Sequence, residues 1–130
     1  MTTLIVEDDF VNRLVLQKRL EEYGEVHIAV NGTEAVDAVK RMLAEGALYD
    51  LICLDIMLPG MDGHEALQEI RAAEAAKGYR VGQGSKIVMT TALRDSENVM
   101  GAFRHEADGY LVKPIDPDKL REQLSNLGLL

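Results

Sequence analysis

A chain of 130 residues, with 47% hydrophobic and 28% charged side chains, has room for one sizeable core and the composition of an ordinary globular domain. We therefore expect a single domain over residues 1–130, with no output domain. The formal net charge of −8 repels nucleic-acid phosphates and anionic lipid, which argues against nucleic acid or a membrane as partner.

Five short runs of β-branched or aliphatic residues predict β-strands. In chain order they cover residues 4–6, 26–29, 51–54, 87–89 and 110–112. Several of these runs are apolar at consecutive rather than alternate positions. Such a pattern is typical of a parallel sheet with both faces covered by helices.

The segments between these runs have helical periodicity. The first, residues 11–23, carries an apolar stripe and ends at Gly24; residues 33–45, 62–76 and 95–104 follow, and a last helix opens at Asp116-Pro117. The stripe of the first helix comprises Val11, Val15, Leu16, Leu20 and Tyr23. The order predicts an α/β fold, a doubly wound (βα)5 domain with a parallel five-stranded sheet of order 2-1-3-4-5.

One connection is longer than usual. Residues 77–85, with the sequence KGYRVGQGS, contain three glycines and predict a mobile surface loop. A binding role for Tyr79 and Arg80 is the alternative, but neither belongs to a motif.

Polar side chains follow four of the predicted strands. They are Glu7, Asp8 and Asp9 after the first strand, Asp55 after the third, Thr90 and Thr91 at the fourth, and Lys113 at the fifth. Open parallel sheets bind ligands at the carboxyl ends of their strands, at the point where strand order reverses. With the order 2-1-3-4-5, the first and third strands are neighbours there, so their carboxylates should lie close together.

Such a cluster of carboxylates favours a cation. Two unit charges ~4 Å apart at an effective dielectric constant of ~20 repel by roughly 4 kcal/mol. Oxygen ligands suit a hard cation such as Mg²⁺. Beside that cation and the ammonium of Lys113, Asp55 is a plausible nucleophile towards phosphorus, and Thr91 is placed to donate its hydroxyl to a phosphoryl oxygen.

Four segments carry a resemblance to a known family. The runs LIVEDD, LICLDIMLPGMDG, VMTTA and DGYLVKP resemble, in the same order, the signature segments of response-regulator receiver domains, the CheY-like modules of two-component systems and phosphorelays. The resemblance covers essentially the whole chain. It implies a flavodoxin-like, CheY-like fold and a signalling phospho-acceptor, which catalyses only its own phosphorylation and a slow autodephosphorylation.

The resemblance assigns roles to individual residues. Asp55 resembles the phospho-acceptor, and Glu7 and Asp8 resemble the acidic pair that holds Mg²⁺, or Mn²⁺ in its place. Met57 would contribute its backbone carbonyl to the metal. Glu7 stands where many relatives have aspartate.

The remaining signature positions imply a switch. Thr91 resembles the switch hydroxyl, Ala92 the small residue that keeps the pocket open, and Lys113 the phosphate-contacting lysine. Tyr110 resembles the aromatic switch, although a plain core role fits its position as well. The bond between Lys113 and Pro114 is commonly cis in the family.

The resemblance also implies partners and kinetics. A sensor histidine kinase or histidine phosphotransfer protein would donate the phosphoryl group. A downstream protein would bind the face formed by the helix expected over residues 95–104, the strand expected over residues 110–112 and the last helix. We expect a cytoplasmic monomer or weak dimer. Because Met57 and Leu93 are apolar, neither can orient an attacking water, which predicts slow autodephosphorylation.

Three other functions compete with this interpretation. A haloacid-dehalogenase-like phosphatase needs a second aspartate two residues after the nucleophile, where this chain has Met57. A flavodoxin-like FMN carrier needs a Ser-, Thr- and Gly-rich loop after the first strand, where this chain reads EDDF. A receiver that docks without phosphorylation would not need the complete set of chemical residues.

Several other residues have plainer interpretations. Asp62 is expected to cap the third helix, Asp9 to be a cap or solvent-facing residue, and Thr90 to be a strand residue. The single cysteine, Cys53, is expected to be buried and structural. The three histidines, His27, His64 and His105, show no ligand spacing and are interpreted as incidental.

Overall fold

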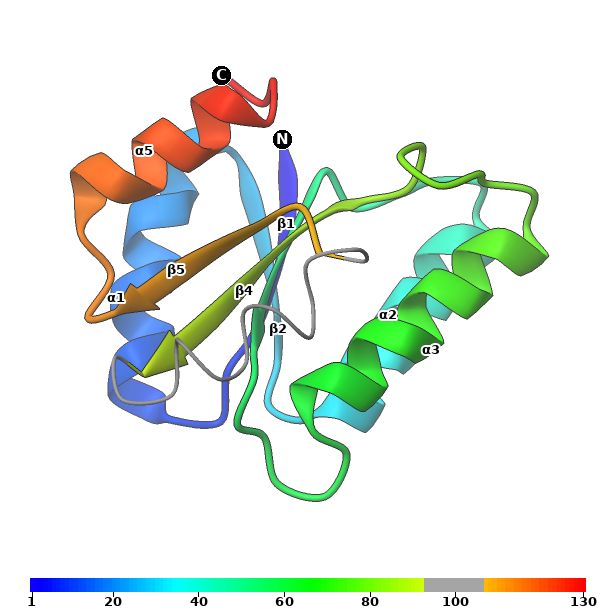
Figure 1. Ribbon diagram of the computed structural model, residues 1–130, viewed down its shortest axis with the longest axis horizontal. Coiled ribbons are helices and arrows are strands. Elements are labelled where there is room, and N and C mark those ends of the chain that lie inside the picture. Colours follow the sequence, from blue (N-terminus) through cyan, green and yellow to red (C-terminus); the bar gives the residue numbers. More distant parts are fainter. Residues whose placement is uncertain (93–106) are drawn as a thin grey trace.

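The structure, a computed structural model, describes residues 1–92 and 107–130 (Figure 1). The helix expected over residues 95–104, together with Leu93 and His105, lies outside the described residues. None of the helices within the described ranges combines the length and the apolar composition that a bilayer crossing requires.

Strands and helices alternate along the chain. Their bounds are β1 (Thr2–Val6), α1 (Phe10–Leu20), a short 3-10 helix η1 (Glu21–Tyr23), β2 (Glu25–Ala29), α2 (Gly32–Ala44), β3 (Leu51–Asp55), α3 (Gly63–Ala76), β4 (Lys86–Ala92), β5 (Gly109–Lys113) and α5 (Pro117–Asn126). All four strand pairings are parallel, and the order is β2-β1-β3-β4-β5. The predicted fold class and strand order are confirmed.

The sheet is the middle layer of three. Helices α1 and α5 lie on one side of the sheet and α2 and α3 on the other (Figure 1). Each side has its own core, one including Ile5, Leu20 and Leu124 and the other including Leu4, Leu54 and Ile70. Alternate residues of β1 therefore enter different cores, as the two-residue period of a strand requires.

The central strand β3 is buried at all five positions. This burial explains why its sequence is apolar at consecutive positions. Cys53 lies within β3, and complete burial raises the pKa of its thiol to about 12. The thiol is therefore protonated and shielded at neutral pH, which agrees with the structural role expected for it.

Helix α1 corrects one expectation. Leu16 and Leu20 of the predicted stripe are buried, but Val11 and Val15 are 64% and 45% exposed. The core therefore covers only part of the predicted stripe, the part that includes Leu16 and Leu20. Together with Phe10 and Leu14, which are also exposed, these valines form what we call the α1 apolar patch.

Each long helix begins at a capping side chain. Asp9, Asn31, Asp62 and Asp116 each accept a hydrogen bond from a backbone N–H group in the first turn of their helix. These bonds satisfy donors that have no partner within the helix. The predicted capping roles of Asp9 and Asp62 are confirmed.

The loop of residues 77–85 is fixed at its base. The buried carboxylate of Glu74 accepts hydrogen bonds from Ser85 N and from Arg71 Nη1, both at 2.8 Å. Arg71 Nη2 in turn lies 2.9 Å from Asp108 Oδ2. The tip remains a surface feature, since Val81 is fully exposed, whereas Tyr79 packs against the core on the α2 and α3 side.

Candidate functional site

Three carboxylates meet at the carboxyl edge of the sheet. Strand β1 pairs with β3 up to Val6 and Leu54, so Glu7 and Asp55 follow at neighbouring strand ends. One carboxylate oxygen from each of Glu7, Asp8 and Asp55 lies within 4.8 Å of the other two. Glu7 and Asp55 are buried, and Asp8 is exposed. The convergence expected from the strand order is therefore present.

Lys113 joins this cluster from the end of β5. Its Nζ lies 2.6 Å from Glu7 Oε1 and 3.0 Å from Asp55 Oδ2. The lysine side chain is only 19% exposed, so both ion pairs are shielded from water. Among the described residues, these three carboxylates and the ammonium that pairs with them carry two surplus negative charges, the amount that one divalent cation neutralises.

The pKa values reflect this surplus. Burial raises the pKa of Glu7 above its ordinary value of 4.5, and Asp55 adds to the increase, while Lys113 acts in the opposite direction. For Lys113, burial alone would lower the pKa, but the hydrogen bonds and charges of Glu7 and Asp55 outweigh it and raise the pKa. The ammonium therefore stays charged, and it does not neutralise the carboxylates completely.

Backbone contacts hold Asp55 at its strand end. Asp55 Oδ1 accepts a hydrogen bond of 3.2 Å from Met57 N, and Ile56 N donates to Thr90 O of the neighbouring strand at 3.0 Å. Gly63 packs so closely behind this turn that a Cβ atom there would lie 2.5 Å from the Asp55 carbonyl oxygen. Only glycine lets the start of α3 approach so near.

The loop between β1 and α1 carries Glu7 and Asp8. Glu7 N donates to Ala29 O at 3.1 Å, and Asp9 N donates to Glu7 Oε2 at 3.3 Å. Arg13 Nη1 donates to the carbonyl oxygens of both Glu7 and Asp8. This contact of Arg13 was not predicted from the sequence, in which its one signal is a basic residue one turn into the helix that follows an acidic loop.

The residues expected to form a switch lie on β4 and β5. Thr91 is fully buried, and its hydroxyl donates to Ala92 O at 3.2 Å. Tyr110 is partly buried and packs against the core on the α2 and α3 side. The bond between Lys113 and Pro114 is cis, as the resemblance implied. The switching roles of Thr91 and Tyr110 remain predictions.

An apolar hollow lies beside the acidic cluster. It has a volume of about 250 Å³ and lies between α1 and the segment after β5, lined by Val11, Val15, Pro114 and Ile115 together with Glu7 and Lys113. The hollow is continuous with the α1 apolar patch through Val11 and Val15. Thr90, interpreted as a plain strand residue, also lines it.

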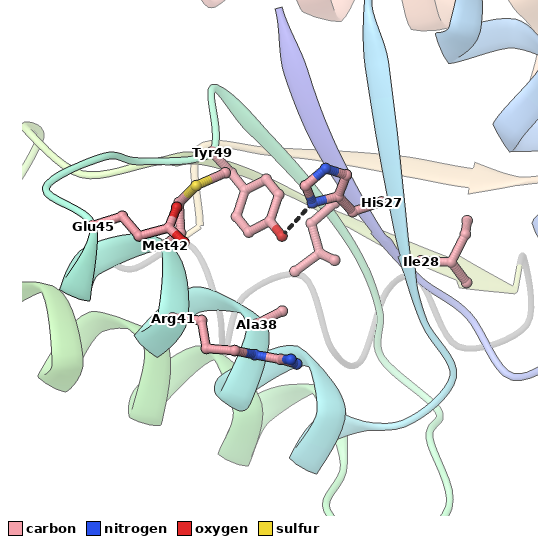
Figure 2. A pocket seen from close by; sticks show the side chains of 8 residues that line it. His27, Ile28, Ala38, Arg41, Met42, Glu45 and Tyr49 are labelled. Carbon is pink, nitrogen blue, oxygen red and sulfur yellow. Dashed lines mark hydrogen bonds between the residues drawn. The ribbon is translucent and has the colours of Figure 1, made fainter.

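A second hollow lies away from this site, between β2 and α2 (Figure 2). His27 Nδ1 and the Tyr49 hydroxyl are 2.7 Å apart there, and their rings meet edge to face. His27 thus has a definite structural contact with Tyr49. Its bonding partner comes from the segment before β3, so no spacing in the sequence indicated the pair.

The fold and the cluster together define a class of protein. They describe a doubly wound parallel α/β domain with a carboxylate and lysine site at the point where the strand order reverses. A sequence profile described as "Response regulator receiver domain" matches residues 3–125. Because this match spans nearly the whole chain, the protein belongs to the response-regulator receiver family of two-component systems.

Individual relatives agree with this assignment. Chemotaxis protein CheY of Halobacterium salinarum is 33% identical over 125 residues, which are 95% of this chain and 93% of that protein. The osmosensing histidine protein kinase SLN1 of Saccharomyces cerevisiae is 33% identical over 124 residues, 94% of this chain but 10% of that protein. The chain spans less than half the length of several curated relatives that it matches.

A solved structure is similar over the full fold. It is the receiver domain of sensor histidine kinase PA1611 from Pseudomonas aeruginosa PAO1, crystallised with a magnesium ion coordinated in its active-site cleft. The TM-score is 0.78 with 28% identity, covering 98% of this chain and 97% of that one.

Proposed function

We propose that this receiver domain accepts a phosphoryl group on Asp55 in a Mg²⁺-dependent reaction. The observation that carries the proposal is the meeting of the Glu7, Asp8 and Asp55 carboxylates with the Lys113 ammonium on the same Asp55 side chain. The magnesium ion in the cleft of the PA1611 receiver domain supports the choice of metal. Mn²⁺ fits the same oxygen ligands.

Side-chain oxygens of Glu7, Asp8 and Asp55, with the backbone carbonyl of Met57, would hold the metal. When bound, Mg²⁺ supplies positive charge that offsets the carboxylates and the oxygens of an incoming phosphoryl group. A carboxylate oxygen of Asp55 forms the new bond to phosphorus. The phosphorus–nitrogen bond of a donor phosphohistidine breaks, and the imidazole leaves with the electron pair.

Lys113 is placed to pair first with the Asp55 carboxylate and then with the phosphoryl group that Asp55 accepts. Its Nζ is already held within 3.0 Å of Asp55, so it needs little movement to pair with a phosphoryl oxygen bonded there. Thr91 donates its hydroxyl to a second phosphoryl oxygen, giving up its bond to Ala92 O. Tyr110 follows this movement, and the altered surface on β5 and α5 passes the signal to a downstream protein.

The domain is proposed to work as a cytoplasmic acceptor, monomeric or weakly dimeric, rather than as a turnover enzyme. A haloacid-dehalogenase-like phosphatase lacks its general acid here, because Met57 occupies that position with an exposed apolar side chain. The direct test is incubation with acetyl phosphate, with Mg²⁺ or with a chelator, followed by intact mass measurement. We expect the protein to gain one phosphoryl group only with Mg²⁺. If it gained none in either condition, the remaining function would be that of a receiver that docks without phosphorylation.

The phosphoryl group should be lost slowly. The Met57 side chain is 64% exposed next to Asp55 and has no polar atom able to orient a water for attack. Replacing Met57 by asparagine should shorten the lifetime of the aspartyl phosphate about 10-fold. Loss of the phosphoryl mass after removal of the donor measures this lifetime. A wild-type lifetime of a few seconds, or no change in the variant, would refute the role given to Met57.

The α1 apolar patch is the expected docking surface for the phosphohistidine donor. It lies beside the acceptor site and is continuous with the hollow lined by Lys113. Exposed apolar patches of this kind mark protein interfaces. Leu14→Ser should slow transfer from a phosphorylated histidine phosphotransfer domain about 10-fold, because an apolar contact is lost.

Ile28→Ser is a matched control, because Ile28 is as exposed as Leu14 but lies on the edge strand β2. Transfer is measured from the fastest donor in a panel of phosphorylated phosphotransfer domains. Acetyl phosphate should modify both variants at the wild-type rate, since it needs no docking surface. Equal transfer rates for both variants would exclude α1 as the docking surface.

A further inference from the structure

Arg13 fastens the loop from which two of the clustered carboxylates project. Its Nη1 lies 3.1 Å from Glu7 O and 3.4 Å from Asp8 O. A single guanidinium thus donates hydrogen bonds to two successive backbone carbonyl groups. Because the guanidinium contacts carbonyls and not the carboxylates, Glu7 and Asp8 keep their acidic oxygens directed at the cluster.

The guanidinium also contacts an aromatic ring. Its Cζ lies 5.5 Å from the centre of the Phe10 ring, a distance at which a cation is attracted to an aromatic face. Phe10 is 65% exposed, so core packing does not explain its large apolar side chain. Contact with Arg13 gives Phe10 a role within its own helix, in addition to its place in the α1 apolar patch.

We propose that Arg13, held by Phe10, is a positioning residue for the cation site. This inference rests on the proposed function, because it concerns how the same carboxylates hold Mg²⁺. The direction of the Glu7 and Asp8 carbonyl groups fixes the backbone of the loop and so the positions of the two carboxylates. A site whose ligands are displaced by a fraction of an ångström binds its metal more weakly. Arg13 therefore acts through the backbone and does not touch the metal.

If Arg13 acted only through its charge, its removal would change the Mg²⁺ affinity in the opposite direction. The positive charge of Arg13 lies near the cluster and by itself repels a divalent cation, so removing it would tighten Mg²⁺ binding. Loss of positioning instead weakens binding. The direction of the change in affinity therefore separates the two roles.

The experiment is a Mg²⁺ titration of wild type and variants, followed by the NMR shifts of the amides of Asp8 and Asp55. Arg13→Gln is expected to raise the Kd about 10-fold. Arg13→Lys keeps the charge but not the planar guanidinium, so it should restore only part of the affinity. Arg19→Gln, which removes the same charge later on the same helix, should leave the Kd unchanged.

A second readout needs no metal. In Arg13→Gln without Mg²⁺, the Asp9 amide should exchange with solvent about 10-fold faster, because the loop that places Glu7 Oε2 beside it is released. Equal or tighter Mg²⁺ binding by Arg13→Gln would overturn the inference, and so would an unchanged exchange rate. Absence of Mg²⁺ shifts in the wild type would instead refute the proposed metal site, with the exchange rate still deciding the role of Arg13.

Discussion

Replacing Asp55 by asparagine should reduce phosphoryl acceptance from acetyl phosphate by at least ~10³-fold, because an amide oxygen does not act as the nucleophile. The substitution keeps the shape of the side chain and its place at the end of β3. Intact mass after incubation with acetyl phosphate and Mg²⁺ measures the occupancy. The wild type should gain one phosphoryl group and the variant none.

Asp50→Asn is the matched control for this result. Asp50 lies just before β3, at the amino-terminal ends of the strands and so away from the acidic cluster. Its carboxylate accepts a hydrogen bond from Thr2 N at 2.7 Å. This variant should accept the phosphoryl group like the wild type. If Asp55→Asn still gained a phosphoryl group, another residue would be the acceptor.

Replacing Lys113 by methionine should destabilise the metal-free protein by about 2–4 kcal/mol at neutral pH. The buried carboxylates of Glu7 and Asp55 would then face each other without their shared ammonium. Added Mg²⁺ should recover stability more strongly in the variant than in the wild type, because it replaces the missing charge. Urea unfolding with a chelator and with Mg²⁺ measures both effects.

The loss of stability in Lys113→Met should also depend on pH. The pKa of Glu7 is raised in the folded state, so folded Glu7 binds its proton more tightly than unfolded Glu7. This contribution to stability is lost as pH rises through the raised pKa and is fully present below 4.5. Without Lys113 the pKa of Glu7 should rise further, so the destabilisation should shrink as the pH falls from neutral towards 4.5.

Lys86→Met serves as the control for this prediction. Lys86 begins β4 at the opposite edge of the sheet, so its removal should cause neither the Mg²⁺-dependent recovery nor the same pH dependence. A loss of stability in Lys113→Met that was the same at every pH and with or without Mg²⁺ would show that the lysine contributes by packing alone.

The sequence predicted the fold because its signals are local. Strands covered on both faces leave runs such as residues 51–54, and caps such as Asp62 occupy a fixed position before their helix. The convergence of Glu7, Asp8 and Asp55 followed from one further step, the strand order. Once β1 and β3 are neighbours, their terminal carboxylates must meet.

Other features depend on contacts that periodicity does not encode. The apolar stripe of α1 gave no indication that Val11 and Val15 are exposed. The pair of His27 and Tyr49 joins segments 22 residues apart, and Arg13 acts through backbone carbonyls that carry no sequence signal. The anchoring of the loop of residues 77–85 depends on Glu74, which reads as an ordinary helical surface residue but is buried.

Paramagnetic broadening by Mn²⁺ tests the cation site most directly. At substoichiometric Mn²⁺, amide signals next to Glu7, Asp8 and Asp55 should disappear first, and excess Mg²⁺ should restore them. Broadening that began instead at exposed acidic residues elsewhere, such as Glu21 and Glu22, would contradict the account, because the buried carboxylates would then not be the preferred site of a divalent cation.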